Sequence, residues 1–338
     1  MISLAKFSST LIITCLFAVL SFTPSYSVAQ TKKATAFTTE LRATQKQYGL
    51  NPHSPLISRI AATPVDIIKQ FRDAGMSPTE HSMTKEERRM VAMAFASLPS
   101  LHQRVLKQHL KSISFLDNMP NTALTSPVTS DEEVNLYHIT FRSGILHQTI
   151  SDWVTEKELT CFSGGDSTIS VSIQAGLLNA LTYVLLHEST HVVDGSLQLI
   201  STDTVAGKPQ VNAFTASFSN GVWRDIRTHD WQFTASLVSK SRFRPGGRRF
   251  LFNEATKVYN GLSQTPFVSL YSMSSWHEDL AELLTVYHLT KKCKQPFRII
   301  VRQNGKEILQ YEPMNSPLVQ RRIVLLRRFY AKRHASLF

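Results

Sequence analysis

The chain has 338 residues, of which 42% are hydrophobic and 18% are charged. This composition supplies enough apolar material for one large domain or two small ones, and it excludes both a disordered chain and a coiled coil. Lysine and arginine total 37 against 25 aspartate and glutamate residues, which gives a net charge of +12. This excess of positive charge favours an acidic partner or surface.

The first thirty residues have the pattern of a secretory signal peptide. Lys6 precedes an apolar run at 11–22, and small residues at 27–29 form a cleavage site that ends at Ala29. The apolar run is shorter than the roughly 20 residues that cross a bilayer, which argues against the alternative of a membrane anchor. We therefore predict a signal peptide at 1–29, cleavage after Ala29, a secreted or periplasmic location, and no transmembrane segment in the mature chain.

Removal of that segment leaves two cysteines, Cys161 and Cys293, in a chain that has left the reducing cytosol. They either form one long-range disulfide or remain two unrelated buried thiols, because the sequence does not give the separation of their Cα atoms. The sequence contains neither a CxxC pair nor a Cys/His cluster, so neither cysteine is predicted to bind a metal.

Hydrophobic periodicity and turn residues divide the mature chain into three regions. Residues 30–110 form a helical N-terminal region, in which a capping box at Thr84 begins a helix over 84–98. Residues 111–312 form a central domain, and residues 313–338 form a basic C-terminal tail helix.

Five short segments of the central domain have the composition of β-strands. The runs at 112–116 and 136–141 begin a small sheet, and the clean alternation at 168–173 predicts an edge strand. The segments 297–302 and 307–311 form a hairpin, because an Asn-Gly pair between them favours a type I′ turn.

Two longer helices are expected at 175–194 and 276–290. The first contains no proline and is apolar nearly all round, as a buried central helix should be. Gly195 stands where a residue in the left-handed conformation commonly ends a helix. We therefore predict a mainly helical α+β fold with a small sheet and one central helix.

The central helix carries the sequence His-Glu-x-x-His, formed by His187, Glu188 and His191. Two histidines four residues apart lie one turn apart on the same helix face, so both imidazoles can bind one divalent ion with Glu188 beside them. Zn²⁺ suits such nitrogen and oxygen ligands and needs no redox partner. The alternative is a hydrogen-bonded histidine pair in the core, with Glu188 solvated at an opening in the packing.

A catalytic zinc site needs a third protein ligand. Glu278 and Glu282 share one face of the second helix, so Glu278 could bind the ion while Glu282 orients a ligating histidine from behind. Asp194 falls on the same arc of the central helix as the two histidines. We predict that it supports the ligands from behind, as Glu282 does, and it is also the alternative carboxylate. His277 is the alternative neighbour of Glu278. The two glutamates also fit an ordinary solvated helix face.

An HExxH motif followed by a downstream ExxxE resembles the gluzincin zinc metallopeptidases. The fuller pattern, with Tyr271 seven residues before Glu278, is similar to the catalytic domain of anthrax lethal factor. This resemblance implies a zincin-like catalytic domain over 111–312, with Glu278 as the third zinc ligand, Glu282 behind the ligands and Tyr271 facing the substrate carbonyl. It covers two short segments, and 87 positions separate His191 from Glu278, so an inserted element must cover that distance.

These observations predict an exported zinc metallopeptidase that acts on a protein or peptide substrate, with Glu188 as general base. The edge strand at 168–173 is a natural place for an extended substrate to pair. The alternative is a basic exported protein that binds a polyanion or the cell envelope and has a non-catalytic metal site. It would use the loop Arg242–Arg249 and the tail, whose basic residues are Arg321, Arg322, Arg327, Arg328, Lys332 and Arg333. Charge runs of this kind are more often solvated surface.

Overall fold

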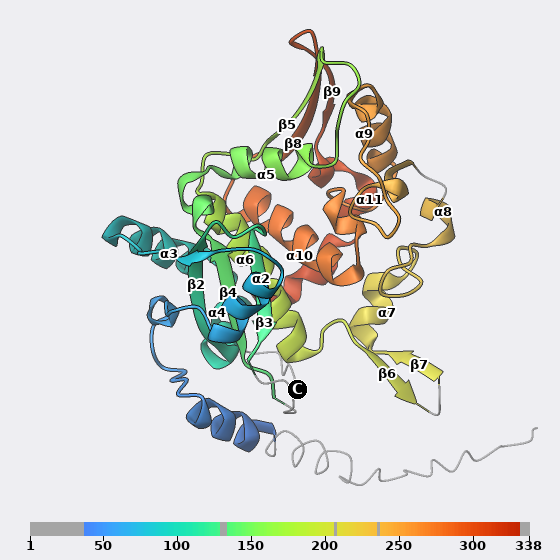
Figure 1. The fold of residues 1–338 in the computed structure, drawn as a ribbon. Coiled ribbons are helices and arrows are strands. Elements are labelled where there is room, and N and C mark those ends of the chain that lie inside the picture. The colour runs from blue at the N-terminus through green and yellow to red at the C-terminus, as the bar shows by residue number, and fades with distance from the viewer. Residues whose placement is uncertain (1–36, 129–133, 206–207, 235–236, 332–338) are drawn as a thin grey trace, which may run out of the picture.

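The computed structural model describes residues 37–128, 134–205, 208–234 and 237–331 (Figure 1). The predicted signal peptide and its cleavage site at Ala29 lie outside these residues. Among the helices of the described residues, none combines the length and the apolar character needed to span a membrane.

The structure has an α+β fold, as predicted, but with two small sheets in place of the one predicted, and the larger sheet has four strands. These are β1 (Thr79–Glu80), β2 (Leu110–Asp117), β3 (Ala123–Pro127) and β4 (Tyr137–Arg142), in the order β1-β2-β4-β3. The two runs predicted to begin a sheet are β2 and β4, which pair in parallel, while β3 pairs antiparallel to β4. Strand β3 therefore forms one edge of this sheet.

The smaller sheet has the order β5-β8-β9, formed by β5 (Ile169–Gln174), β8 (Arg298–Gln303) and β9 (Lys306–Tyr311). The predicted edge strand is β5, and the predicted hairpin is the pair β8 and β9. Asn304 and Gly305 both have positive φ, 49° and 77°, as a type I′ turn requires. A separate two-stranded ribbon is formed by β6 (Thr202–Val205) and β7 (Lys208–Val211).

Helices surround and connect these sheets. Residues 37–47 are helical, and the labelled helices are α2 (Val65–Asp73), α3 (Lys85–Ser97), α4 (Ser100–His109), α5 (Ile150–Leu159), α6 (Ala180–Leu197), α7 (Ala213–Ser219), α8 (Trp231–Thr234), α9 (Ala255–Ser263), α10 (Trp276–Tyr287) and α11 (Pro317–Gln320). Helix α6 contacts α3, α4, α5, α10 and β3, so it is central to the fold (Figure 1). The side chain of Thr84 accepts from the N–H of Glu87, which confirms the predicted capping box before α3.

Helix α6 does not have its predicted ends. It begins five residues late, because Gly176 takes a positive φ of 86° and Asn179 then caps the N–H of Leu181. It continues past Gly195 and ends at Leu197, and the next residue, Gln198, caps it in the left-handed conformation with a φ of 48°. The prediction that Gly195 ends the helix is wrong: it lies inside α6, where a Cβ atom would overlap the hydroxyl of Tyr137. A glycine is needed there for close packing against a strand rather than for a turn.

One hydrophobic cluster extends from the N-terminal helices to the tail. It includes Phe95 of α3, Leu186 of α6, Leu284 of α10 and Phe329, all of them buried. The cluster crosses the predicted boundaries at 110 and 312, so these three regions share one core. Between 313 and 331 the tail forms three short helices rather than the one predicted: the 3₁₀ helix η7 (Pro313–Asn315), α11, and the 3₁₀ helix η8 (Ile323–Tyr330).

The two cysteines are both free thiols. Of the two alternatives, the disulfide between Cys161 and Cys293 is therefore not formed. Cys161 is buried and Cys293 is half-buried, and burial raises the pKa of both thiols. Arg242 and Lys157 lower the pKa of Cys161 only in part against this burial, so both thiols stay protonated at neutral pH.

Candidate metal centre

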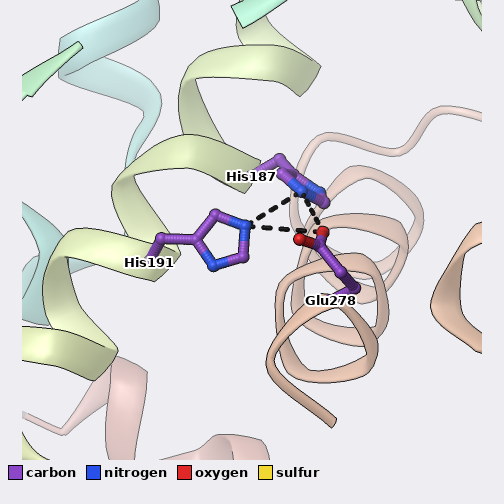
Figure 2. Close-up of side chains that lie close together, drawn as sticks. All are labelled: His187, His191 and Glu278. Carbon is purple, nitrogen blue, oxygen red and sulfur yellow. Dashed lines mark hydrogen bonds and ion pairs between the residues drawn. The ribbon is translucent and has the colours of Figure 1, made fainter. Parts of the chain in front are cut away.

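Three potential metal ligands from two distant parts of the chain converge on one point. His187 and His191 lie one turn apart on α6, and Glu278 lies in the first turn of α10 (Figure 2). The Nε2 atom of His187 is 3.0 Å from Oε2 of Glu278 and 3.2 Å from Nε2 of His191. The third side of the triangle, from Nε2 of His191 to Oε2 of Glu278, measures 3.5 Å.

This triangle has the size of a face of a zinc coordination tetrahedron. Zinc binds histidine nitrogen and carboxylate oxygen at about 2.0–2.2 Å, so adjacent ligand atoms of a tetrahedral site lie about 3.3–3.5 Å apart. The three measured sides, 3.0, 3.2 and 3.5 Å, differ from this by a few tenths of an ångström. Within the described residues these three side chains are the group that could hold a metal ion. Two imidazoles and one carboxylate are also a donor set that zinc favours.

Local sequence explains why Glu278 is well placed. Ser275 caps α10 through its side chain, which accepts from the N–H of Glu278. Burial alone would raise the pKa of Glu278, but the hydrogen bonds and charges of His187 and His191 lower it well below its usual range. Glu278 is therefore held as a carboxylate, the form that binds a metal ion.

The electrostatics of His187 show that the ligand triangle attracts positive charge. Burial opposes the charged form of the ring, but the nearby carboxylates of Glu278 and Glu282 outweigh it and raise the pKa of His187 to about 10. A proton on the His187 ring or a bound metal ion would each meet this demand. Metal ions and protons therefore compete for the site.

Glu282 lies one turn beyond Glu278 and supports His187 from behind. Its Oε1 atom is 3.1 Å from Nδ1 of His187, within ion-pair distance, although the ring N–H does not point along this line. The Oε2 atom accepts a hydrogen bond of 2.7 Å from the hydroxyl of Ser269. Burial would raise the pKa of Glu282, but Lys157, His187 and Ser269 lower it to about 2. Glu282 is thus a buried carboxylate at the position from which it can orient a ligand.

Glu188 faces the edge of the larger sheet. Its Oε2 atom accepts a hydrogen bond of 2.6 Å from the hydroxyl of Thr125, which belongs to the edge strand β3. Sequence analysis did not identify Thr125, because a single hydroxyl in a short strand gives no signal. The contact fixes one oxygen of Glu188, the residue that directly follows His187 on α6.

Tyr271 lies in the 3₁₀ helix η5 (Tyr271–Met273), which contacts α10. Its ring centroid is 5.9 Å from that of His187 and 4.9 Å from that of Phe243. Burial, followed by the charges of Glu278 and Glu188, raises the pKa of its hydroxyl well above the usual range. Tyr271 is therefore a neutral phenol that can donate a hydrogen bond.

Asp194 and His277, the two alternatives for the ligand set, contact each other instead. Nδ1 of His277 is 2.6 Å from Oδ2 of Asp194, and the other carboxylate oxygen accepts from the N–H of Ile200. This pair lines a cavity of about 420 Å³ beside the ligand triangle, together with His191, Gly195, Ile226 and Trp276. A cavity of this size can accept a side chain of a bound ligand.

Several cations of the two predicted basic surfaces are paired or hydrogen-bonded within the chain. Arg244 donates to the carbonyl oxygens of Met273, Ser274 and Arg227, and Arg248 pairs with Glu254 at 2.6 Å. Arg322 is buried and pairs with Asp279. Lys332 and Arg333 lie outside the described residues. These contacts reduce the charge that the two segments can offer to an acidic surface.

Comparison with known protein families, with curated proteins and with solved structures found no match to this chain.

Proposed function

We propose that this protein is an exported zinc-dependent metallopeptidase with a zincin-like catalytic domain. The observation that carries the proposal is the ligand triangle of His187, His191 and Glu278, whose sides of 3.0 to 3.5 Å suit a tetrahedral zinc ion. Glu188 lies in the same helical turn as the first ligand and is oriented by Thr125. Two imidazoles and one carboxylate to bind the metal ion, with a second carboxylate nearby that does not bind it, are the components of metal-assisted hydrolysis.

In the proposed reaction His187, His191 and Glu278 would hold the zinc ion. When bound, the ion would supply Lewis acidity that polarises the scissile carbonyl and makes a water molecule more acidic. Glu188 accepts the proton of the attacking water and delivers it to the leaving amine. The neutral hydroxyl of Tyr271 donates a hydrogen bond to the oxygen of the substrate carbonyl as charge develops on it, a contribution of about 3 to 4 kcal/mol where one such donor has been removed.

An extended peptide could reach this site along β3. We predicted that the edge strand β5 pairs with substrate, but it is β3 whose Thr125 touches the general base. Strand β3 is also an edge strand, so it has backbone groups that are free to pair with a substrate strand. Contact with Glu188 therefore favours β3 over β5 as the substrate-binding edge.

The alternative of a polyanion-binding protein rests on the same basic segments described above. Arg244 and Arg322 are committed to contacts inside the fold, and no observation favours a polyanion over a peptide. We retain it as an outcome of the experiment below.

The test begins with elemental analysis of the purified mature chain and a peptide-library digest with and without a chelator. We expect one zinc ion per chain and cleavage that the chelator abolishes. Glu188→Gln should retain zinc and lose turnover, whereas Glu156→Gln, on an exposed glutamate of α5, should retain both. Cleavage by Glu188→Gln would refute the general base, and absence of metal would refute the enzyme. Salt-sensitive heparin retention without any cleavage would favour the polyanion-binding alternative.

A further inference from the structure

Lys157 of α5 occupies a position behind the candidate metal centre that sequence analysis did not identify. Its Nζ atom is 3.3 Å from Oε1 of Glu282 and 3.7 Å from the ring centroid of Tyr271. The side chain is 19% exposed, so its ammonium group is largely removed from water. One cation therefore contacts both the carboxylate behind His187 and the ring proposed to face the substrate.

The contact with Glu282 has an electrostatic reason. The side chain of Glu282 is 2% exposed, and a buried carboxylate needs a compensating charge. Oε1 of Glu282 faces both Lys157 and Nδ1 of His187, so the ammonium group sets where this oxygen lies relative to the ligand. With a divalent ion bound, the ion and Lys157 would together balance the three formal negative charges of Glu188, Glu278 and Glu282.

The contact with Tyr271 has a geometric reason. A cation 3.7 Å from a ring centroid lies on the ring face, where the π electrons attract it, and the attraction is strongest for a group shielded from water. Phe243 packs edge-on against the same ring. Two contacts, one from Lys157 and one from Phe243, therefore hold the plane of the Tyr271 ring. They limit the direction of its hydroxyl group as well.

We propose that Lys157 is a positioning residue that sets the orientation of the ligand His187, through Glu282, and of Tyr271, through its ring face. This inference rests on the proposed function for its effect on turnover, but its effect on metal binding is independent of any peptidase activity. It assigns the residue no contact with substrate or metal.

The test compares three variants of the full chain. Lys157→Met removes the ammonium group and keeps the aliphatic stem, and Lys157→Arg keeps the charge. Lys111→Met is the matched control, since Lys111 is also partly buried but lies on β2 with its Nζ beside Gly49. Zinc affinity is measured by competition with a chelating dye, and the ligand geometry by the absorption spectrum of the Co²⁺-loaded protein.

We expect Lys157→Met to weaken zinc binding about tenfold or more and to alter the Co²⁺ spectrum, as loss of support behind a ligand does. Lys157→Arg should restore most of the affinity, and Lys111→Met should match the unaltered protein. Lys157→Met should also lower kcat with KM unchanged. The same substitution should lower kcat by a smaller factor when it is made in Tyr271→Phe. Zinc affinity equal to that of Lys111→Met, or effects on kcat that are independent of Tyr271, would overturn the proposal.

Failure of this inference can be told apart from failure of the proposed function. If the unaltered protein binds no zinc or cleaves no peptide, the proposed function fails. The contact of Lys157 with Glu282 is then judged in the metal-free protein, by a double-mutant cycle of urea unfolding with Lys157→Met and Glu282→Gln. A coupling between the two substitutions would support the positioning role, and strict additivity would overturn it.

Discussion

Replacing Arg322 should destabilise the helix that carries two of the site's glutamates. Asp279 lies on α10 between Glu278 and Glu282 and is fully buried. Arg322 donates to both of its carboxylate oxygens, at 3.0 Å and 2.6 Å, and the indole N–H of Trp223 donates to one of them at 2.8 Å. In Arg322→Met the bidentate partner is lost while the carboxylate stays buried, with one neutral donor remaining.

The expected magnitude follows from that geometry. Removing one partner of a buried ion pair leaves an uncompensated charge and costs about 3–5 kcal/mol. Since domains are stable by about 5–15 kcal/mol, Arg322→Met should lower the urea midpoint strongly. Its exposed neighbour provides the control: Arg321→Met should change the free energy of unfolding by less than about 0.5 kcal/mol. Adding Asp279→Leu should recover part of the loss.

A free energy of unfolding for Arg322→Met within about 1 kcal/mol of that for Arg321→Met would refute this reasoning. It would mean that Asp279, whose pKa burial already raises, takes up a proton or becomes hydrated once the arginine is gone.

The buried acid Glu158 and the proposed general base Glu188 can each be tested by a single substitution. Burial raises the pKa of Glu158 to about 7, above its ordinary 4.5, so its folded form keeps a proton that the unfolded chain releases. The resulting stabilisation is complete below pH 4.5 and is lost as the pH rises to 7, by up to about 3 kcal/mol. In Glu158→Gln, the free energy of urea unfolding should therefore change less with pH across this range. An unchanged pH dependence would exclude Glu158 as the cause. Thr125→Val removes the hydroxyl that orients Glu188. Because a hydrogen bond to a charged group contributes about 1.5–3 kcal/mol, kcat should fall about tenfold to a hundredfold while the zinc content stays unchanged. An unaltered kcat would show that Glu188 needs no such support.

The parts of the site that the sequence could indicate are those set by spacing along one helix. His187 and His191 are four residues apart, as are Glu278 and Glu282, so each pair lies on one face of its helix wherever that helix packs. The contact between α6 and α10 is not a local property of either helix. Predicting it required the additional expectation that one metal ion would bind side chains from both helix faces.

Thr125 and Lys157 could not be found in the same way. Their contacts join residues 63 and 125 positions apart, and no spacing rule connects them. A threonine in a short strand and a lysine in a helix are also ordinary surface residues in a sequence. Gly195 shows the converse, since its position after an apolar helix favoured a helix end, while the packing of Tyr137 is what requires it.

The long segment between His191 and Glu278 has a physical role that the spacing of the motif alone did not suggest. Arg244 comes from this segment and donates to the carbonyl oxygens of Met273 and Ser274, at 2.7 and 3.2 Å. Phe243 packs its ring against Tyr271. The turn that carries Tyr271 is too short to fix its own orientation, because a single 3₁₀ turn contains few internal hydrogen bonds. The inserted chain therefore contacts both the Tyr271 ring and the turn that carries it, and these contacts limit the orientation of Tyr271 beside His187.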